Sequence, residues 1–237
     1  MFQGKRFLGI IPARKGSKRL PNKNLLTLKD RPLISWTIES ALHSNNLDSV
    51  ILSSDSEKIL SLGENYGIEF PLIRPDYLSE DDSVREDVIR HAINFLKEED
   101  CQNYDYFVYL QPTSPLRTSL HIDAAIEFTI DSNAKSVFSV CEIDHPIEWS
   151  SYISENKSME SFNVENLIKQ SQEFKKRFRL NGAIYICNIE NFLQCSSMFF
   201  GKDSYAFEMD KFSSIDIDDK YDFMIAESFM ENIKNDC

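Results

Sequence analysis

The sequence predicts an α/β fold built on a doubly wound, mainly parallel sheet. Short apolar runs that suit buried strands alternate with segments of helical periodicity, which is the order found in parallel sheets with right-handed crossovers. The chain has 237 residues, 42% of them hydrophobic, which is ample for the core of one domain. Polar motifs follow two of the predicted strands, and ligands of open α/β sheets bind at the carboxyl ends of the strands.

The predicted elements alternate through the first 140 residues and end in a helix. We expect strands at Phe7–Ile11, Ser49–Ser53, Glu69–Ile73, Tyr106–Leu110 and Ser136–Val140. We expect helices at Leu33–Ser44, Ser56–Tyr66, Ser119–Asp131 and from Tyr221 to about Asn232, with another after Ser83. Pro32 and Gly67 suit a helix start and a helix stop. Ser83 and Glu86 have the spacing of a capping box.

Composition limits the classes of function. A formal net charge of −12 argues against a nucleic-acid partner, because such proteins usually carry a basic surface. No apolar run approaches the length of a membrane span, and no signal peptide is visible, so we expect neither a membrane nor export. The five cysteines are scattered without C-x-x-C spacing, which is typical of a reduced, cytoplasmic protein. The isolated histidines give no support to a zinc site.

A basic loop, Ile10–Asn24, follows the first predicted strand and contains Arg14, Lys15, Lys18, Arg19 and Lys23. A nucleoside triphosphate carries about four negative charges, which Lys, Arg and backbone N–H groups neutralise well. Gly16 lacks a Cβ, so its backbone can approach a phosphate oxygen closely. The loop is predicted to bind phosphate; the alternative is a solvated basic loop. The chain contains neither a Walker motif nor G-x-G-x-x-G, so another nucleotide-binding geometry is needed.

A second polar motif, Gln111-Pro-Thr-Ser-Pro-Leu-Arg117, follows the predicted strand at Tyr106–Leu110. Its two prolines force a sharp, irregular turn at the carboxyl end of that strand. The neutral hydrogen-bonding groups and the single cation suit a polyhydroxylated carboxylate sugar. Farther on, Asn181-Gly182 precedes another strand-like run; Asn181 offers a donor and an acceptor, although an Asn-Gly turn is the simpler interpretation.

Two carboxylates near the end of the chain predict a metal site. The alternation Ile215-Asp216-Ile217-Asp218 puts both aspartates on the same side of an extended strand. Neighbouring carboxylates repel each other unless a cation lies beside them. Mg²⁺ prefers oxygen ligands and is often held by one or two carboxylates together with substrate phosphates. A plain acidic turn before the last helix is the alternative, and it is the simpler explanation for Asp219 and Asp222.

The four motifs together resemble the acylneuraminate cytidylyltransferases, the enzymes that make CMP-activated sialic acids and other nonulosonic acids. The matching stretches are Ile-Pro-Ala-Arg-Lys-Gly-Ser-Lys-Arg-Leu-Pro-Asn-Lys-Asn, Leu-Gln-Pro-Thr-Ser-Pro-Leu-Arg, Asn-Gly-Ala-Ile-Tyr-Ile and Ser-Ile-Asp-Ile-Asp. The resemblance extends from Ile10 to Asp218. It implies a single Rossmann-like nucleotidyltransferase domain over residues 1–237, with an irregular dimerisation arm at about 141–179 that reaches a second subunit. A flexible surface insertion is the alternative for that segment.

The resemblance also implies roles for individual residues. The nucleotide-binding residues carried over are Arg14, Ser17, Lys18, Lys23, Asn24 and Arg74. For Arg74, which precedes a proline as in the family, a solvated loop arginine is an equal alternative. Sugar-binding roles fall to Gln111, Asn181 and Gln172, metal binding to Asp216 and Asp218, and catalytic roles to Arg14, Lys18, Lys23 and Asp218.

The implied reaction joins CTP to an acidic nine-carbon sugar, with Mg²⁺ as cofactor, and releases pyrophosphate from a homodimeric enzyme. Two alternatives remain: the same chemistry on Kdo, and a non-catalytic nucleotide-binding protein of the same fold. The sequence departs from the family at Ser171 and Lys175, where an Arg and a Pro are usual. That Arg helps to recognise the sugar, so the identity of the sugar stays open; Lys169, Arg177 or Arg179 are possible substitutes.

Overall fold

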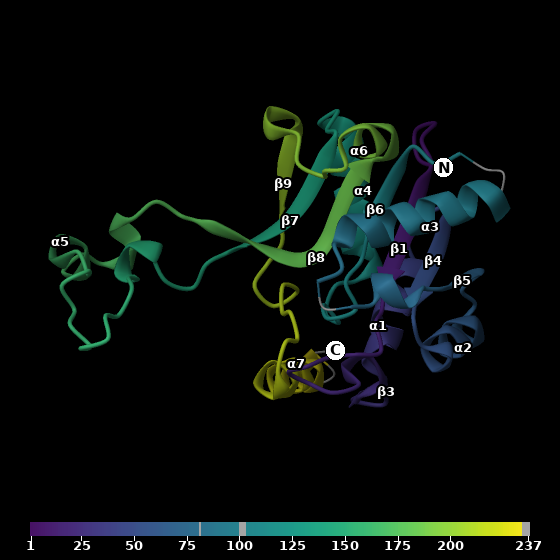
Figure 1. The fold of residues 1–237 in the computed structure, drawn as a ribbon. Coiled ribbons are helices and arrows are strands. Elements are labelled where there is room, and N and C mark those ends of the chain that lie inside the picture. Colours follow the sequence, from purple (N-terminus) through teal and green to yellow (C-terminus); the bar gives the residue numbers. More distant parts are fainter. Residues whose placement is uncertain (81, 100–102, 234–237) are drawn as a thin grey trace.

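The computed structural model describes residues 1–80, 82–99 and 103–233, and its centre is a seven-stranded sheet (Figure 1). The strands are β1 (Phe7–Pro12), β4 (Ser49–Ser54), β5 (Phe70–Ile73), β6 (Tyr106–Tyr109), β7 (Ser136–Glu142), β8 (Phe178–Asn188) and β9 (Ser204–Glu208). Their order is β5-β4-β1-β6-β8-β7-β9. Only β8 pairs antiparallel with its neighbours, so the start of β8 lies at the edge where the other strands end. The predicted doubly wound, mainly parallel sheet is confirmed.

Helices cover both faces of this sheet. On one face lie α1 (Leu33–Leu42), α2 (Glu57–Tyr66) and α4 (Ser119–Asp131), and on the other lie α3 (Arg85–Glu99) and α6 (Ile189–Cys195). Two more helices, α5 (Val164–Leu167) and α7 (Lys220–Ile233), lie away from the sheet. The chain also forms a small hairpin of β2 (Thr27–Leu28) and β3 (Arg31–Pro32). Short 3₁₀ turns occur at Lys23–Leu25, Asp76–Leu78, Ile147–Trp149, Ser171–Glu173 and Gly201–Asp203.

Alternation along β1 divides the core into two layers. Phe7 and Ile11 pack with residues of α1, α2 and α4 on one face of the sheet. Leu8 and Ile10 pack with α3 and α6 on the other face. Successive side chains of a strand point to opposite faces, so a continuous apolar run indicates a strand covered on both sides. A third cluster joins α7 to the hairpin and to the start of α1.

Most predicted elements lie within two residues of their expected bounds. Gly67 ends α2 with a φ of 96°, a left-handed conformation that glycine adopts without strain. The predicted capping box is wrong, because α3 begins at Arg85 and the Ser83 hydroxyl donates to the backbone oxygen of Tyr77 instead. The segment Ile215–Asp218 is not a strand: the Ile217 N–H donates to Thr113 O at 2.8 Å, and Ile217 O accepts from Lys23. Its backbone groups are therefore bonded to loops.

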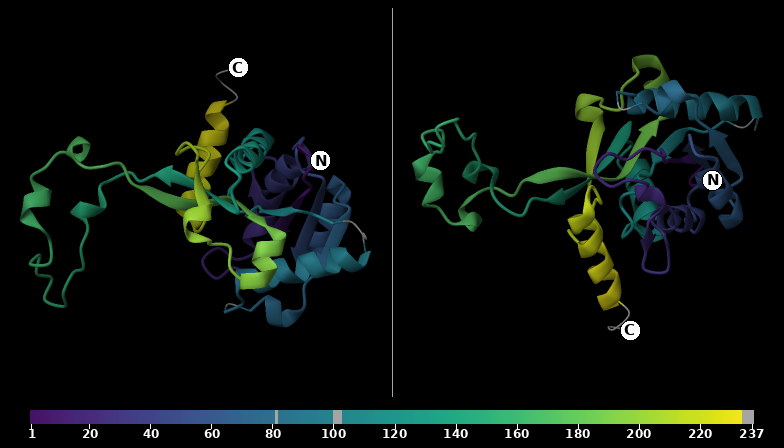
Figure 2. Two further views of the ribbon diagram at one scale, coloured as in Figure 1. Left: turned by 90° about the horizontal axis from the view of Figure 1, so that it is seen from above. Right: turned by 60° about the horizontal axis from the view of Figure 1, so that its bottom comes forward.

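The segment 143–177 projects from the sheet as an arm, between β7 and β8 (Figures 1 and 2). Its apolar side chains are unusually exposed for a folded protein: Tyr152 is 90% exposed and Ile168 81%. α7 also stands apart from the sheet, beside the hairpin and α1. No helix in the described part of the chain is long and apolar enough to cross a membrane.

Candidate active site

A polar pocket of about 420 Å³ opens at the carboxyl ends of β1 and β6. From β1 the chain adds β4 and β5 on one side and β6 on the other, so this is the point where the strand order reverses. Ligands of open α/β sheets bind at such a switch point. The pocket is lined by all six residues predicted to bind nucleotide: Arg14, Ser17, Lys18, Lys23, Asn24 and Arg74.

Backbone contacts hold the basic loop over this pocket. The Asp55 carboxylate, just after β4, accepts a 2.6 Å hydrogen bond from the Lys15 N–H. The Asn24 side chain is buried and donates to Arg14 O at 2.9 Å, so it closes the two ends of the loop. Apart from Gly16 and its two chain neighbours, no atom of the described residues lies within 4 Å of where a Cβ of Gly16 would be, which leaves the backbone there open. These contacts give the loop a shape before any ligand binds.

Arg74 is a buried wall of the pocket, 6% exposed. Its guanidinium donates to Ser53 Oγ at 3.2 Å and to Ser53 O at 2.9 Å, at the end of β4. Burial lowers the pKa of Arg74 from its ordinary value. The interpretation as a solvated loop arginine is therefore wrong. A buried arginine without a carboxylate hydrogen-bond partner among the described residues suits an anionic ligand.

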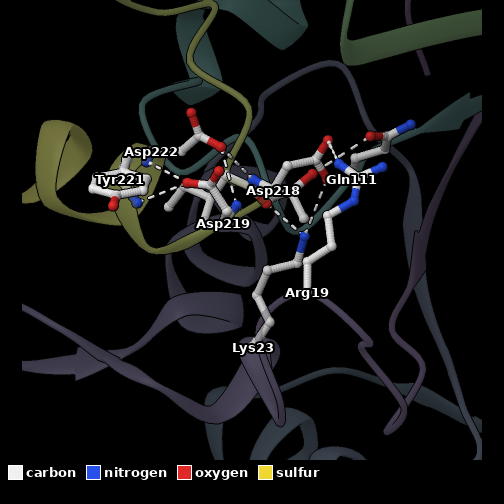
Figure 3. Close-up of polar contacts among 9 residues, drawn as sticks. Arg19, Lys23, Gln111, Asp218, Asp219, Tyr221 and Asp222 are labelled. Carbon is white, nitrogen blue, oxygen red and sulfur yellow. Dashed lines mark hydrogen bonds and ion pairs between the residues drawn. The ribbon is translucent and has the colours of Figure 1, made fainter.

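Asp218 faces the basic loop from the opposite wall (Figure 3). Its carboxylate accepts a 2.7 Å hydrogen bond from Arg19 and lies 3.6 Å from the Lys23 ammonium. The Asp218 N–H donates to Asp222 at 2.9 Å, and Asp219 accepts from the Tyr221 N–H at 2.7 Å. Thus Asp219 and Asp222 cap α7, while the Asp218 side chain lines the pocket. Arg19 was not assigned a role from the sequence, where it is one cation among five.

Asp216 is mostly buried, and one of its carboxylate oxygens is an unsatisfied hydrogen-bond acceptor. Its Oδ1 atom is buried and has no hydrogen-bond partner among the described residues. Burial raises the pKa of Asp216, and the nearby Asp218 carboxylate raises it further. Both aspartates line a second hollow, of about 800 Å³. Two adjacent carboxylates, one with a free buried oxygen, fit Mg²⁺, which needs few protein ligands when phosphates supply the rest.

Gln111 and Gly182 bring the second and third motifs together. Gly182 has a φ of 79°, and a Cβ placed on it would lie 2.8 Å from Gln111 Oε1. The fully buried Arg117 guanidinium donates to Gln111 O at 3.3 Å and to Ala183 O at 3.1 Å. It therefore ties the turn after β6 to the start of β8. Gln111 lines the pocket, as predicted for a residue that contacts substrate.

The Asn181 side chain is not available to a ligand. It is 1% exposed, accepts from Ser139, and donates to Ser214 Oγ at 2.8 Å. A sugar-binding role for its side chain is therefore not supported. Asn181 instead anchors the segment that leads to Asp216, through its hydrogen bond to Ser214. This role depends on contact between the sheet and a segment distant in sequence, so the Asn-Gly pair alone could not predict it.

The family model named Cytidylyltransferase matches residues 8–230 of this chain. The chain belongs to the cytidylyltransferase family. The resemblance inferred from the four motifs is therefore confirmed, and the pocket lies at the switch point, where open α/β sheets bind ligands.

Curated relatives share this family. N-acylneuraminate cytidylyltransferase of Escherichia coli O18:K1:H7 is 37% identical over 222 residues, which cover 93% of this chain and 51% of that protein. Pseudaminic acid cytidylyltransferase of Campylobacter jejuni serotype O:2 is 34% identical, with 93% and 94% covered. CMP-N,N'-diacetyllegionaminic acid synthase of Legionella pneumophila is 33% identical, with 95% and 97% covered. This chain thus spans about half of the first relative and nearly all of the other two.

Solved structures of similar shape include CMP:2-keto-3-deoxy-manno-octonic acid synthetase complexed with CTP. That structure has a TM-score of 0.71 at 15% identity, covering 96% of this chain and 99% of the other. A second is 4-diphosphocytidyl-2C-methyl-D-erythritol synthase of Anaerococcus prevotii, with a TM-score of 0.62 at 12% identity, covering 96% and 97%. At these identities the similarity shows the shared fold.

The structure separates the arm residues from the pocket of this family member. Gln172 is exposed on the arm and bonds to Gln170, away from the residues that line the pocket. Of the three proposed substitutes for the missing arginine, Lys169 lies over the Phe174 ring and Arg177 pairs with Glu148 at 2.5 Å. Arg179 instead lines the hollow that Asp216 and Asp218 share.

Proposed function

We propose that this protein is a CTP-dependent enzyme that forms a CMP-activated nonulosonic acid of the sialic acid type and releases pyrophosphate. The observation that carries the proposal is the arrangement of Asp218 opposite a basic loop at the switch point of the sheet. Cations on one wall suit the triphosphate, and the Asp218 carboxylate on the other, with Asp216 in the hollow that Asp218 also lines, suits the metal that accompanies it. The names of the relatives at 33–37% identity agree with this chemistry.

In the proposed reaction the anomeric hydroxyl of the sugar attacks the α-phosphorus of CTP. The new bond joins the sugar oxygen to that phosphorus, and the bond from the phosphorus to the β-phosphate oxygen breaks. Pyrophosphate leaves with the electron pair, and the hydroxyl proton passes to a basic group or to solvent. Arg14, Lys18 and Lys23 neutralise charge that builds on the leaving group, which is how such reactions are accelerated. Arg74 and Ser17 help to hold the phosphates, and Asn24 keeps the loop closed around them.

Asp216 and Asp218 are the residues proposed to hold Mg²⁺. When bound, the ion supplies positive charge to the phosphate oxygens as a Lewis acid. Arg19 and Lys23 contact the two carboxylate oxygens of Asp218. These two side chains are therefore expected to turn toward the triphosphate as substrate binds, because the phosphates offer more negative charge than one carboxylate.

The proposed sugar site lies beside Gln111, whose side chain rests against Gly182. An amide can donate and accept, which suits sugar hydroxyls. The names of the relatives include N-acylneuraminate, pseudaminic acid and legionaminic acid enzymes, so the proposed substrate is an acid of this nine-carbon type.

We also propose that the enzyme acts as a homodimer in the cytoplasm. The exposed apolar side chains of the arm, such as Tyr152 and Ile168, are suited to burial against a second copy. Such pairing offers Gln172 a route to the other copy's pocket. Cys141, Cys187 and Cys195 are free thiols in the described part of the chain, which fits a reducing compartment.

Pyrophosphate release tests the proposal. The protein is incubated with CTP, Mg²⁺ and a panel containing N-acetylneuraminate, legionaminate, pseudaminate and Kdo, with ATP, GTP and UTP as nucleotide controls. We expect release with CTP and one or more nine-carbon acids. Release with Kdo alone would move the protein to the eight-carbon substrate, and no release from folded protein that binds CTP would support a non-catalytic role.

A further inference from the structure

Arg85, the first residue of α3, lies across two tyrosine rings at the end of the sheet. Its guanidinium carbon is 5.6 Å from the ring centroid of Tyr109 and 5.1 Å from that of Tyr185. The two tyrosines are register partners on β6 and β8, with ring centroids 6.5 Å apart and planes at 11°. The two rings therefore hold the guanidinium in one place.

No carboxylate among the described residues pairs with Arg85. Other arginines of this acidic chain do find one: Arg31 pairs with Glu39 at 2.5 Å and Arg177 with Glu148 at 2.5 Å. A cation at the first residue of a helix is also unfavourable, because the helix dipole is positive there. The helix thus gains no electrostatic stability from this arginine, and its charge remains available to a ligand.

The position of Arg85 is on the sugar side of the proposed site. The phosphate-binding cations come from the loop after β1 and from Arg74 after β5. In the strand order β5-β4-β1-β6-β8, the Arg85 guanidinium lies over β6 and β8, whereas the Arg74 guanidinium is bonded to Ser53 at the end of β4. Both cations lie near Tyr109, but Arg85 also lies over Tyr185 of β8. Tyr109 lines the pocket, and Tyr185 follows Gly182, against which Gln111 rests. The nucleotide therefore has its own cations, and Arg85 lies where the second substrate is expected.

We propose that Arg85 binds the carboxylate of the acidic sugar and contributes to the choice of sugar, an inference that rests on the proposed function. The planar guanidinium offers two parallel N–H groups, which match the two oxygens of a carboxylate. Stacking on Tyr109 and Tyr185 limits its rotation, so little conformational freedom is lost when the carboxylate binds. Neutral sugars lack the group that this cation recognises.

The test compares Arg85→Gln and Arg85→Lys with Arg90→Gln, measuring KM for the sugar and for CTP by pyrophosphate release. Arg90 is a matched control on the same helix: its guanidinium lies 5.4 Å from the Phe192 ring centroid and donates to Ser196 Oγ at 2.7 Å. We expect Arg85→Gln to raise KM for the sugar by about tenfold or more and to change KM for CTP by less than about twofold. Lysine should restore part of the sugar affinity, because it keeps the charge without the bidentate geometry.

Three results would overturn the inference. The first is an unchanged KM for both substrates in Arg85→Gln, and the second is an equal rise in KM for the sugar in Arg90→Gln. The third is a rise in KM for CTP alone in Arg85→Gln, which would assign Arg85 to the triphosphate. If Arg85→Gln does not fold, Arg85→Lys carries the test, since its loss of bidentate binding should still raise KM for the sugar. Circular dichroism and the unfolding midpoint establish which variants are folded.

Equilibrium binding separates this inference from the proposed function. If the wild-type protein turns over none of the acids, calorimetry with the same panel in the presence of CTP is compared for wild type and Arg85→Gln. Binding of an acid that weakens by about tenfold in the variant supports the role of Arg85 even without turnover. Equal binding, or none to either protein, overturns it.

Discussion

The carboxylate of Asp218 accepts a 2.7 Å hydrogen bond from Arg19, a residue 199 positions earlier in the chain. The Lys23 ammonium lies 3.6 Å from the other carboxylate oxygen (Figure 3). This contact joins the loop after β1 to the segment before α7 and closes the pocket with opposite charges on its two walls. In the proposed reaction Arg19 and Lys23 turn from Asp218 to the phosphates of CTP, and the Asp218 carboxylate would then be available to bind the metal ion.

Asp218→Asn is expected to reduce turnover by about 100-fold or more, because one of two metal-holding carboxylates is lost. The side chain is 53% exposed, so we expect its loss to shift the unfolding midpoint by less than about 3 °C. Turnover is measured by pyrophosphate release with saturating Mg²⁺. Asp203→Asn is the matched control, since Asp203 is a carboxylate paired with Lys135 at 2.8 Å and lines neither the pocket nor the hollow. Near-normal turnover in Asp218→Asn would refute the metal role.

The pKa of Asp216 predicts how its charge affects stability. Burial raises the pKa in the folded state above its ordinary value of 3.8, so between these two pKa values the folded state holds more protons than the unfolded state. The stability contributed by the protonated form is therefore full below pH 3.8 and is lost as pH rises through the folded pKa. In metal-free buffer we expect the melting temperature of wild type, relative to Asp216→Asn, to fall as pH increases across this window.

Calorimetric melting of both proteins at several pH values measures this difference. A constant difference from pH 4 to pH 7 would contradict the raised pKa. Addition of Mg²⁺ with CTP at neutral pH should stabilise the wild-type protein more than Asp216→Asn, because only the wild type offers the buried carboxylate oxygen to the ion.

Gly182→Ala is expected to impair the sugar site. The left-handed conformation costs an alanine roughly 1–2 kcal/mol, and the new Cβ would lie 2.8 Å from Gln111 Oε1. The Gln111 side chain must therefore move, and we expect KM for the sugar to rise. Gly67→Ala is the matched control, because Gly67 has a φ of 96° and, its chain neighbours aside, no atom in the described part of the chain lies within 4 Å of the added Cβ. An equal loss of activity in both variants would show that backbone strain alone is responsible.

From the exposed apolar side chains of the arm we predict that the protein forms a concentration-dependent dimer. Replacing both Tyr152 and Ile168 by Ser removes two of the most exposed apolar side chains and is expected to shift the protein toward monomer in sedimentation equilibrium. Leu120→Ser is the control, since Leu120 on α4 is 73% exposed but outside the arm. A monomeric wild type, or a dimer unaffected by the double substitution, would contradict the role given to the arm.

Periodicity in the sequence determined most of the fold. The continuous apolar run from Phe7 to Ile11 predicted a strand covered on both faces, and Gly67 marked the end of α2, because strand burial and helix termination depend on nearby residues. The family also followed from the sequence, since four ordered motifs span Ile10 to Asp218. The capping box at Ser83 failed because a serine hydroxyl can bond to several nearby carbonyls, and here Tyr77 was the one within reach.

Only the tertiary structure decided which side chains face a ligand. Arg74 and Asn181 are both polar and were both predicted to bind substrate. Arg74 lines the pocket, whereas the Asn181 side chain is hydrogen-bonded to Ser139 and Ser214. Other contacts likewise join segments far apart in the chain. Arg19 pairs with Asp218, and Arg85 lies over the rings of Tyr109 and Tyr185. Local sequence sets the chemistry of a side chain. Its partners depend on how distant segments pack, because hydrogen bonds and burial are short-range in space and unrelated to separation along the chain.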